Sequence, residues 1–236
     1  MKRKSSRIAV LLDFFILIPL TLYFGLRLPG RGYYVTSTLV ILELTVPFLL
    51  SFERRRPQAR ELVIVAVLSA LAIASRVVIP IPHFKPMFAV IMLSGVALGA
   101  ESGFMVGAVS AFASNFFYGQ SANTPWQMFA YGAGGMLAGF LFARGRLPRK
   151  PLVLAVFGFV GTLFFVGPLL DTASVFLMLS RLSMAGAWAT YVAGFPVNLS
   201  QAVCTAVTML LFAKPLLEKL DRVRLRYGMG EDEDGL

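Results

Sequence analysis

Apolar stretches long enough to cross a bilayer recur along almost the whole chain, and they limit the possible folds more than any other feature. About 20 consecutive apolar residues span the hydrocarbon core as a helix. Of the 236 residues, 57% are hydrophobic and 14% charged, whereas a soluble domain carries about 25% charged residues. We therefore expect an all-α, polytopic helical membrane protein with no soluble domain. The predicted spans are 8–26, 34–52, 61–80, 87–100, 103–117, 126–143, 151–170 and 186–213.

Basic residues lie beside these spans in an uneven pattern. If the N-terminus is cytoplasmic, 17 of the 22 Lys and Arg residues fall in cytoplasmic segments, and the outer segments keep Arg27, Arg31, Lys85 and Arg181. This asymmetry follows the positive-inside rule and predicts that both termini are cytoplasmic. Basic groups beside spans orient the chain and contact anionic lipid, so the net charge of +10 requires no nucleic-acid partner.

Charged stretches also divide the chain. The basic run "FERRRPQARE" at 52–61 separates two accessory helices, within 1–60, from a six-helix block at 61–226, and 227–236 form an acidic tail. The first span begins like a signal peptide but lacks a small-residue cleavage site, so we expect it to be retained. Residues 172–185 are apolar enough for a ninth span, which would place the C-terminal basic residues outside. A re-entrant or surface helix on the outer side is the better interpretation.

Glycines recur at intervals of four in the spans 87–100 and 103–117, which are joined by little more than "ESG". Small residues at this spacing let helix backbones approach closely in lipid. We therefore interpret as helix-packing positions Gly95, Gly99, Gly103, Gly107, Gly135 and Gly139.

The span 61–80 carries an alanine stripe, Ala66, Ala70 and Ala74, whose spacing puts all three on one helix face. Two interpretations remain open. The stripe either packs inside this chain, as small residues do in membranes, or forms a smooth docking face for a separate membrane subunit.

Enzyme motifs are absent from the sequence. There is no GxxxxGK(S/T), HExxH or GxSxG, and the chain has one histidine, His83, and one cysteine, Cys204. We therefore expect no catalytic residue, no metal, no cofactor and no ATP hydrolysis by this chain. The ionisable residues inside spans are Asp13, Glu43 and Arg76. For the deep Glu43, a proton-linked role and a helix-to-helix hydrogen bond are both open.

Aromatic and amide side chains are interleaved where three outer segments meet, at 80–86, 115–127 and 171–198. An interfacial aromatic belt explains Trp and Tyr, but Asn115 and Gln127 would lie in apolar spans and need partners. Pockets combine apolar and aromatic walls with a few polar groups, and no nucleophile–base pair is present. We expect a ligand pocket without catalysis, formed by His83, Lys85, Asn115, Tyr118, Gln120, Asn123, Thr124, Trp126, Gln127, Tyr131, Asp171, Arg181, Trp188, Tyr191 and Asn198.

The stretch from about 61 to 226 resembles the substrate-binding S component of energy-coupling factor (ECF) transporters. The resemblance rests on the alanine stripe, "HFKP", "GVALGAESGFMVGAVSAFASNFFYGQ", "TPWQMFAYG", "GFPVN" and "AKPLLEKLDR", and is greatest to a cobalamin-linked subgroup. It implies a six-helix core that captures a vitamin, cobalamin or a precursor, outside the cell. It also implies that a transmembrane T component docks on the alanine stripe and that two cytoplasmic ATPases drive import.

A self-sufficient, proton-coupled secondary transporter is the alternative function, with Glu43 or Asp171 carrying the proton. Broken helices at mid-membrane would favour it, and the sequence offers one such break, at Gly194–Pro196. An intramembrane enzyme is disfavoured because the usual nucleophile and metal-binding residues are missing.

Overall fold

The computed structural model describes residues 17–25, 27, 32–54, 58–143, 145–179 and 181–226, and these residues form helices without a strand. The predicted all-α class is confirmed. Asp13, the acidic tail and most of the first predicted span lie outside the described residues. In chain order the helices are α2 (Ile18–Gly25), α3 (Gly32–Arg54), α4 (Ala59–Val77), α5 (Met87–Leu98), α6 (Ala100–Tyr118), α7 (Asn123–Phe142), α8 (Pro151–Gly161), the π-helical η2 (Thr162–Val166), α9 (Gly167–Met178) and α10 (Met184–Arg226).

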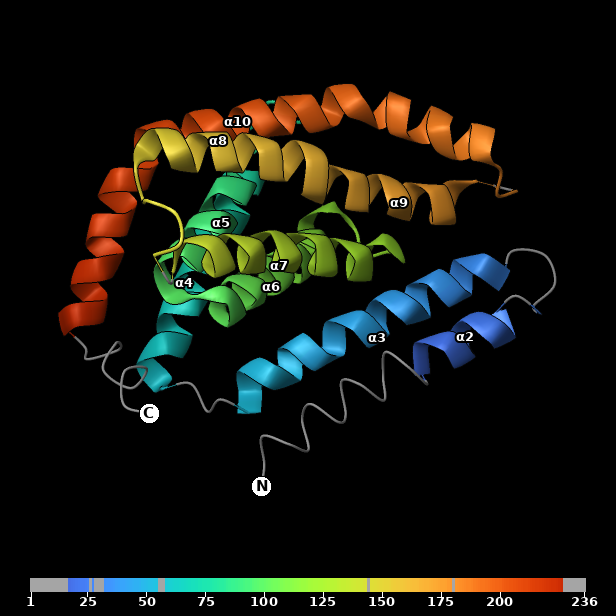
Figure 1. Cartoon of the computed structure of the whole chain (residues 1–236), viewed down its shortest axis with the longest axis horizontal. Helices are drawn as coiled ribbons and strands as arrows, with labels where there is room; N and C mark the ends of the chain where they lie inside the picture. The colour runs from blue at the N-terminus through green and yellow to red at the C-terminus, as the bar shows by residue number, and fades with distance from the viewer. Residues whose placement is uncertain are drawn as a thin grey trace.

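Helix α5 lies at the centre of the bundle. It is apolar on every side, and its residues from Met87 to Ala97 are all buried, as expected for a helix that is hydrophobic all round. It contacts α4, α6, α7, α8 and α10. Figure 1 shows α2 and α3 side by side below this group, where α3 packs against α6, α7 and α9.

Glycines let α5, α6 and α7 approach backbone to backbone, as their spacing predicted. A Cβ added at Gly103 would lie 2.6 Å from the carbonyl oxygen of Gly135 and 2.6 Å from the Cα of Gly95. One added at Gly139 would lie 2.5 Å from the backbone nitrogen of Ala100. Any side chain at these positions would push the helices apart, so the helix-packing interpretation is confirmed for them.

Gly99 is an exception, because it forms the turn between α5 and α6. Its φ is 98°, a conformation that favours glycine, and a Cβ there would meet nothing within 4 Å. The helices therefore separate at this one residue. The predicted connection "ESG" is wrong, since these residues already form the first turn of α6.

Residues 151–178 form one continuous helical segment, in which α8, η2 and α9 follow each other without a break. The span end predicted at 170 and the separate outer helix predicted at 172–185 are therefore wrong. The chain leaves the helix at Leu179, which is extended. Asp171 lies within the helix, and Asn198 of α10 donates a hydrogen bond to its carboxylate.

Helix α10 runs without interruption from Met184 to Arg226, so the span predicted at 186–213 is only part of it and the break expected at Gly194–Pro196 does not occur. Close packing accounts for Gly194, because a Cβ there would lie 2.7 Å from the Cγ of Asp171. Figure 1 shows the C-terminal, red part of α10 turning away from the rest of the helix. Pro215 lies in this part of the sequence, and a proline removes a backbone donor and kinks a helix.

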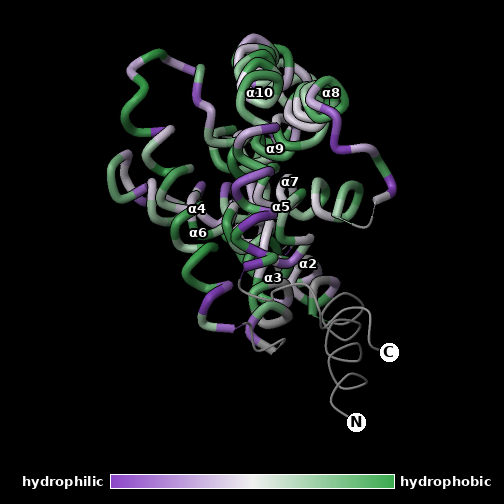
Figure 2. The backbone as a smooth tube through the Cα atoms, turned by 90° about the vertical axis from the view of Figure 1, so that its left-hand side faces the viewer, coloured by the Kyte–Doolittle hydropathy of each residue, from purple (hydrophilic) through white to green (hydrophobic). Residues whose placement is uncertain are grey.

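Two helical segments, Pro151–Met178 and Met184–Arg226, are long and apolar enough to cross a membrane, judged by length and composition over the described residues. Figure 2 shows hydrophobic residues along much of these helices and a hydrophilic connection between α7 and α8. The count of eight spans and the cytoplasmic location of both termini stay predictions.

The connections α6–α7 and α9–α10 lie on the right in Figure 1, at the end of the bundle that we call the α6–α7 end. At the opposite end, Arg149 pairs with Asp221 at 3.3 Å, and Arg224 donates to the carbonyl of Ala97 at 2.5 Å. These contacts attach the last turns of α10 to the end of α5 and to the segment before α8.

Candidate functional site

Asn115 is the centre of a hydrogen-bonded amide network at the α6–α7 end. It is 3% exposed, and its Nδ2 donates to the Oγ1 of Thr124 at 3.0 Å and to the Oε1 of Gln127 at 2.7 Å. The contact arises because α6 ends at Gly119, whose φ of 97° allows the chain to reverse, so that the last turn of α6 faces the first turns of α7. The amides that the sequence places near apolar spans therefore find partners in each other.

Thr124 and Gln120 continue this network away from Asn115. The Thr124 hydroxyl donates to the Oε1 of Gln120 at 2.9 Å and accepts from the backbone N–H of Ser121 at 3.2 Å. The Nε2 of Gln120 then donates to the carbonyl of Phe112 at 2.9 Å. The interleaved polar residues of this loop thus fix the α6–α7 connection to both helices.

Arg76, in the last turn of α4, joins the network, although the sequence analysis did not assign it to the site. Its Nη1 donates to the Oδ1 of Asn115 at 3.1 Å and to the hydroxyl of Ser114. Its guanidinium lies over the ring of Tyr118, 4.7 Å from the centroid, and the Tyr118 hydroxyl donates to the Arg76 carbonyl at 2.9 Å. The available signal was its charge inside a predicted span, which marks a residue as a functional candidate.

Trp126 is buried rather than open to the outer side. It is 7% exposed and stacks on Phe176 of α9, with 5.9 Å between ring centroids and 20° between planes. Ile41 of α3 and Ala173 of α9 complete this cluster. Tyr131, five residues further along α7, lies in the core with its ring edge-to-face on Phe88 at 4.8 Å.

Two polar atoms near the start of α7 remain without a partner in the part of the chain that the structure describes. They are the buried Nε1 of Trp126, a donor, and the buried Oδ1 of Asn123, an acceptor. Buried Trp N–H groups usually find a partner, and a buried polar group left unpaired costs about 1–3 kcal/mol. This pair could therefore hydrogen-bond a ligand that supplies an acceptor and a donor.

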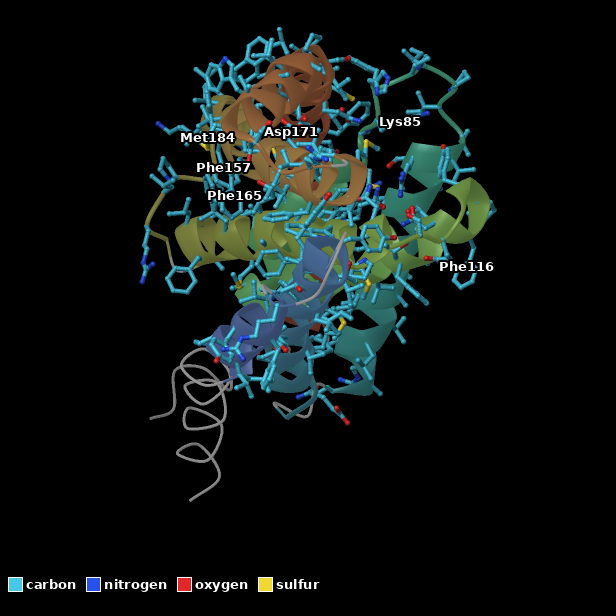
Figure 3. All side chains as sticks on the ribbon, turned by 90° about the vertical axis from the view of Figure 1, so that its right-hand side faces the viewer. Lys85, Phe116, Phe157, Phe165, Asp171 and Met184 are labelled. Carbon is cyan, nitrogen blue, oxygen red and sulfur yellow. The ribbon has the colours of Figure 1, made fainter. Side chains whose placement is uncertain are left out.

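A second polar group lies between α9 and α10. Asn198 donates to the Oδ2 of Asp171 at 2.6 Å, and both residues are buried. One position further along α9, the Thr172 hydroxyl is 2.7 Å from the hydroxyl of Tyr191. Figure 3 views the molecule from the α6–α7 end, with Asp171 on α9 and Lys85 on the loop before α5. Among the described residues, no hydrogen bond joins Asp171, Tyr191 or Asn198 to the amide network that the sequence analysis grouped with them.

The remaining predicted site residues are more open. His83 is exposed with a φ of 57°, and Lys85 donates to the Ile79 carbonyl within the same loop. Arg181 and Trp188 are exposed beside the start of α10, Trp188 at 73%. In the described part of the structure, no hydrogen bond or ion pair joins any of these four residues to the amide network.

All three residues of the alanine stripe are exposed on α4, whereas Ser69 and Ala72 on the same helix are buried. Packing against the described part of this chain therefore does not explain the stripe, and its role in docking stays a prediction.

The sequence left two roles open for Glu43, a helix-to-helix hydrogen bond and a proton-linked role. The Thr21 hydroxyl of α2 donates to its Oε1 at 2.6 Å, so the helix-to-helix hydrogen bond is present. A proton-linked role stays untested.

The described residues thus form an all-helical bundle with two segments long and apolar enough to cross a membrane and a polar network at one end. A family model describing the S component of ECF-type riboflavin transporters matches residues 57–218. The chain belongs to this family, while α2 and α3 lie outside the match. No curated protein and no solved structure matches the chain.

Membership in this family makes the chain a membrane-integral, substrate-binding transporter subunit and not a member of an enzyme family. Such S components work with a T component and ATPase modules. The family model is named for riboflavin, and nothing in the comparisons supports the cobalamin-linked subgroup.

Proposed function

We propose that the chain captures a vitamin from outside the cell at the α6–α7 end and delivers it to an ATP-driven ECF importer. The observation that carries this proposal is the buried, unpartnered donor and acceptor at the start of α7, Trp126 Nε1 and Asn123 Oδ1, near the amide network of Asn115, Thr124 and Gln127. A ligand with complementary groups would gain hydrogen bonds there without breaking existing ones.

Riboflavin is the first ligand to test. The family description supports it, and its planar ring carries carbonyl and N–H groups along one edge. Phe176 already stacks on Trp126, with 5.9 Å between ring centroids. We therefore expect Phe176 to move aside when a flavin ring stacks on Trp126.

The exposed alanine stripe of α4 is the proposed docking face for the T component. Small side chains let a partner helix approach closely in lipid, and no described element of this chain covers them. The alternative, a proton-coupled secondary transporter, loses its main support because α10 is continuous through Gly194 and Pro196.

Titration of the detergent-purified protein with riboflavin, followed by quenching of flavin fluorescence, tests the proposal. Trp126→Phe retains an aromatic ring but removes the N–H, so we expect affinity to fall by about 2- to 12-fold, the value of one hydrogen bond. Trp188→Phe is the comparison, because Trp188 is 73% exposed. The aromatic-belt explanation predicts equal, negligible effects of both changes.

Cobalamin is titrated in parallel. Binding of cobalamin without binding of riboflavin would identify cobalamin as the ligand and support the resemblance to the cobalamin-linked subgroup. Binding of neither by the folded protein would contradict a site for these vitamins at the α6–α7 end.

A further inference from the structure

We propose that Arg76 determines the donor–acceptor polarity of the amide network, so that Gln127 offers an N–H donor to the ligand. Arg76 is then a specificity-determining residue that acts through two amides without touching the ligand. This inference rests on the proposed function, since it takes Gln127 to face the ligand.

The argument starts from the chemistry of arginine. A guanidinium donates hydrogen bonds and accepts none, so whichever Asn115 atom faces the Arg76 Nη1 must be the acceptor, Oδ1, as observed at 3.1 Å. The other end of the Asn115 amide, the Nδ2 donor, is thereby directed at α7. An asparagine amide on its own could adopt either orientation.

The same logic applies one step further along. Because Asn115 Nδ2 is a donor, the Gln127 atom that it meets at 2.7 Å must be the acceptor, Oε1. The Nε2 of Gln127 is left as a donor, and it makes no hydrogen bond within the described residues. Thr124 is oriented in parallel: its oxygen accepts from Asn115, and its proton is directed to Gln120.

The surroundings of Arg76 fix the orientation of the Asn115 amide. Three neutral groups hold it, the Ser114 hydroxyl, the Asn115 carbonyl oxygen and the Tyr118 ring, and it has no carboxylate partner among the described residues. Without a competing anion, Asn115 is the charge-assisted acceptor, and such hydrogen bonds are about twice as strong as neutral ones. An uncharged residue at 76 that can both donate and accept would lose this directionality.

The test begins without ligand. Side-chain amide resonances of ¹⁵N-labelled protein in detergent should show slow water exchange for the Asn115 NH₂ group and fast exchange for the Gln127 NH₂ group. In Arg76→Gln the protection of Asn115 should fall, whereas Arg76→Lys, which also only donates, should preserve it. Protection of the Gln127 NH₂ group in the unmodified protein would overturn the proposal irrespective of any ligand.

Riboflavin titration then measures the consequence. We expect Arg76→Gln to weaken binding by about 2- to 12-fold, the value of one hydrogen bond, and Arg76→Lys to restore most of it. In a Gln127→Leu background the Arg76→Gln change should lower riboflavin affinity little further, because the effects of substitutions within one network do not add. Additive losses would mean that Arg76 acts on affinity by another route and would refute the inference.

Arg146→Gln is the matched control. Arg146 also lies over an aromatic ring, with its guanidinium 4.8 Å from the Phe140 centroid, and donates to a backbone carbonyl, but at the opposite end of the bundle. It should change neither the amide exchange nor the affinity. If the unmodified protein binds no riboflavin, the proposed ligand fails, while the exchange pattern still decides the polarity of the network.

Discussion

Gly103→Ala tests the backbone-to-backbone packing on which the whole bundle depends. The added Cβ would lie 2.6 Å from the Gly135 carbonyl oxygen on α7 and 2.6 Å from the Gly95 Cα on α5. A carbon–oxygen contact needs about 3.3 Å and a carbon–carbon contact at least about 3.5 Å. Both neighbours are backbone atoms, so no side-chain rotation relieves the overlap, and α6 must move away from two helices by about 0.7–0.9 Å.

The expected free-energy change follows from two opposing terms. Alanine is favoured over glycine in a helix by about 1 kcal/mol, and overpacking costs about 1–3 kcal/mol, occasionally more. Because α6 overlaps with two backbones at once, we expect the upper part of that range and a net loss of about 1–2 kcal/mol.

Gly161→Ala is the matched control. Its Cβ would meet the Met92 Cε at 3.5 Å, an ordinary contact with a flexible side chain, so the same substitution should be neutral or stabilising. Denaturant unfolding in detergent, followed by the fluorescence of the buried Trp126, gives both values. Equal stability of the two variants would refute the packing argument.

Four further changes test the site and its surroundings. Trp126→Ala should lower the free energy of unfolding by about 3–5 kcal/mol, since the side chain is 7% exposed; a melting curve like that of the unmodified protein would contradict its burial. Gln127→Ala should weaken riboflavin binding by about 5-fold or more, from the lost donor, and leave melting nearly unchanged. Ala70→Trp adds bulk to an exposed face, so co-purification with the T component should be lost while riboflavin binding survives; loss of both would indicate a general folding defect. Asn198→Leu leaves Asp171 without its hydrogen bond and should destabilise the protein by about 1–3 kcal/mol, which chemical denaturation would measure.

The sequence allowed the helical class and the close glycine contacts to be predicted, because both follow from local patterns. Long apolar stretches indicate membrane helices, and small residues spaced four apart lie on one face of a helix, where they allow close packing. The need of Asn115 and Gln127 for partners was also predictable, since amides near lipid must be satisfied. Their pairing with each other was not, because it depends on how sharply the chain turns at Gly119.

The errors have a common physical cause, which is that a partner on another helix changes what a residue can do. The predicted span ends at 170, just before the charged Asp171, whose carboxylate pairs with Asn198 of α10 inside a helix that continues. Gly194 resembles a helix break until its missing side chain makes room for that same carboxyl group. Trp126 was expected at the outer edge of the molecule, but residues of α3 and α9 bury it.

The most direct test of the account is uptake of radiolabelled riboflavin into proteoliposomes that contain the protein alone, or the protein with its T component and ATPases. We predict that the protein alone binds riboflavin without accumulating it, and that concentrative uptake requires the partners and ATP. Concentrative accumulation by the protein alone, driven by a proton gradient and abolished by an uncoupler, would contradict the account and establish a secondary transporter.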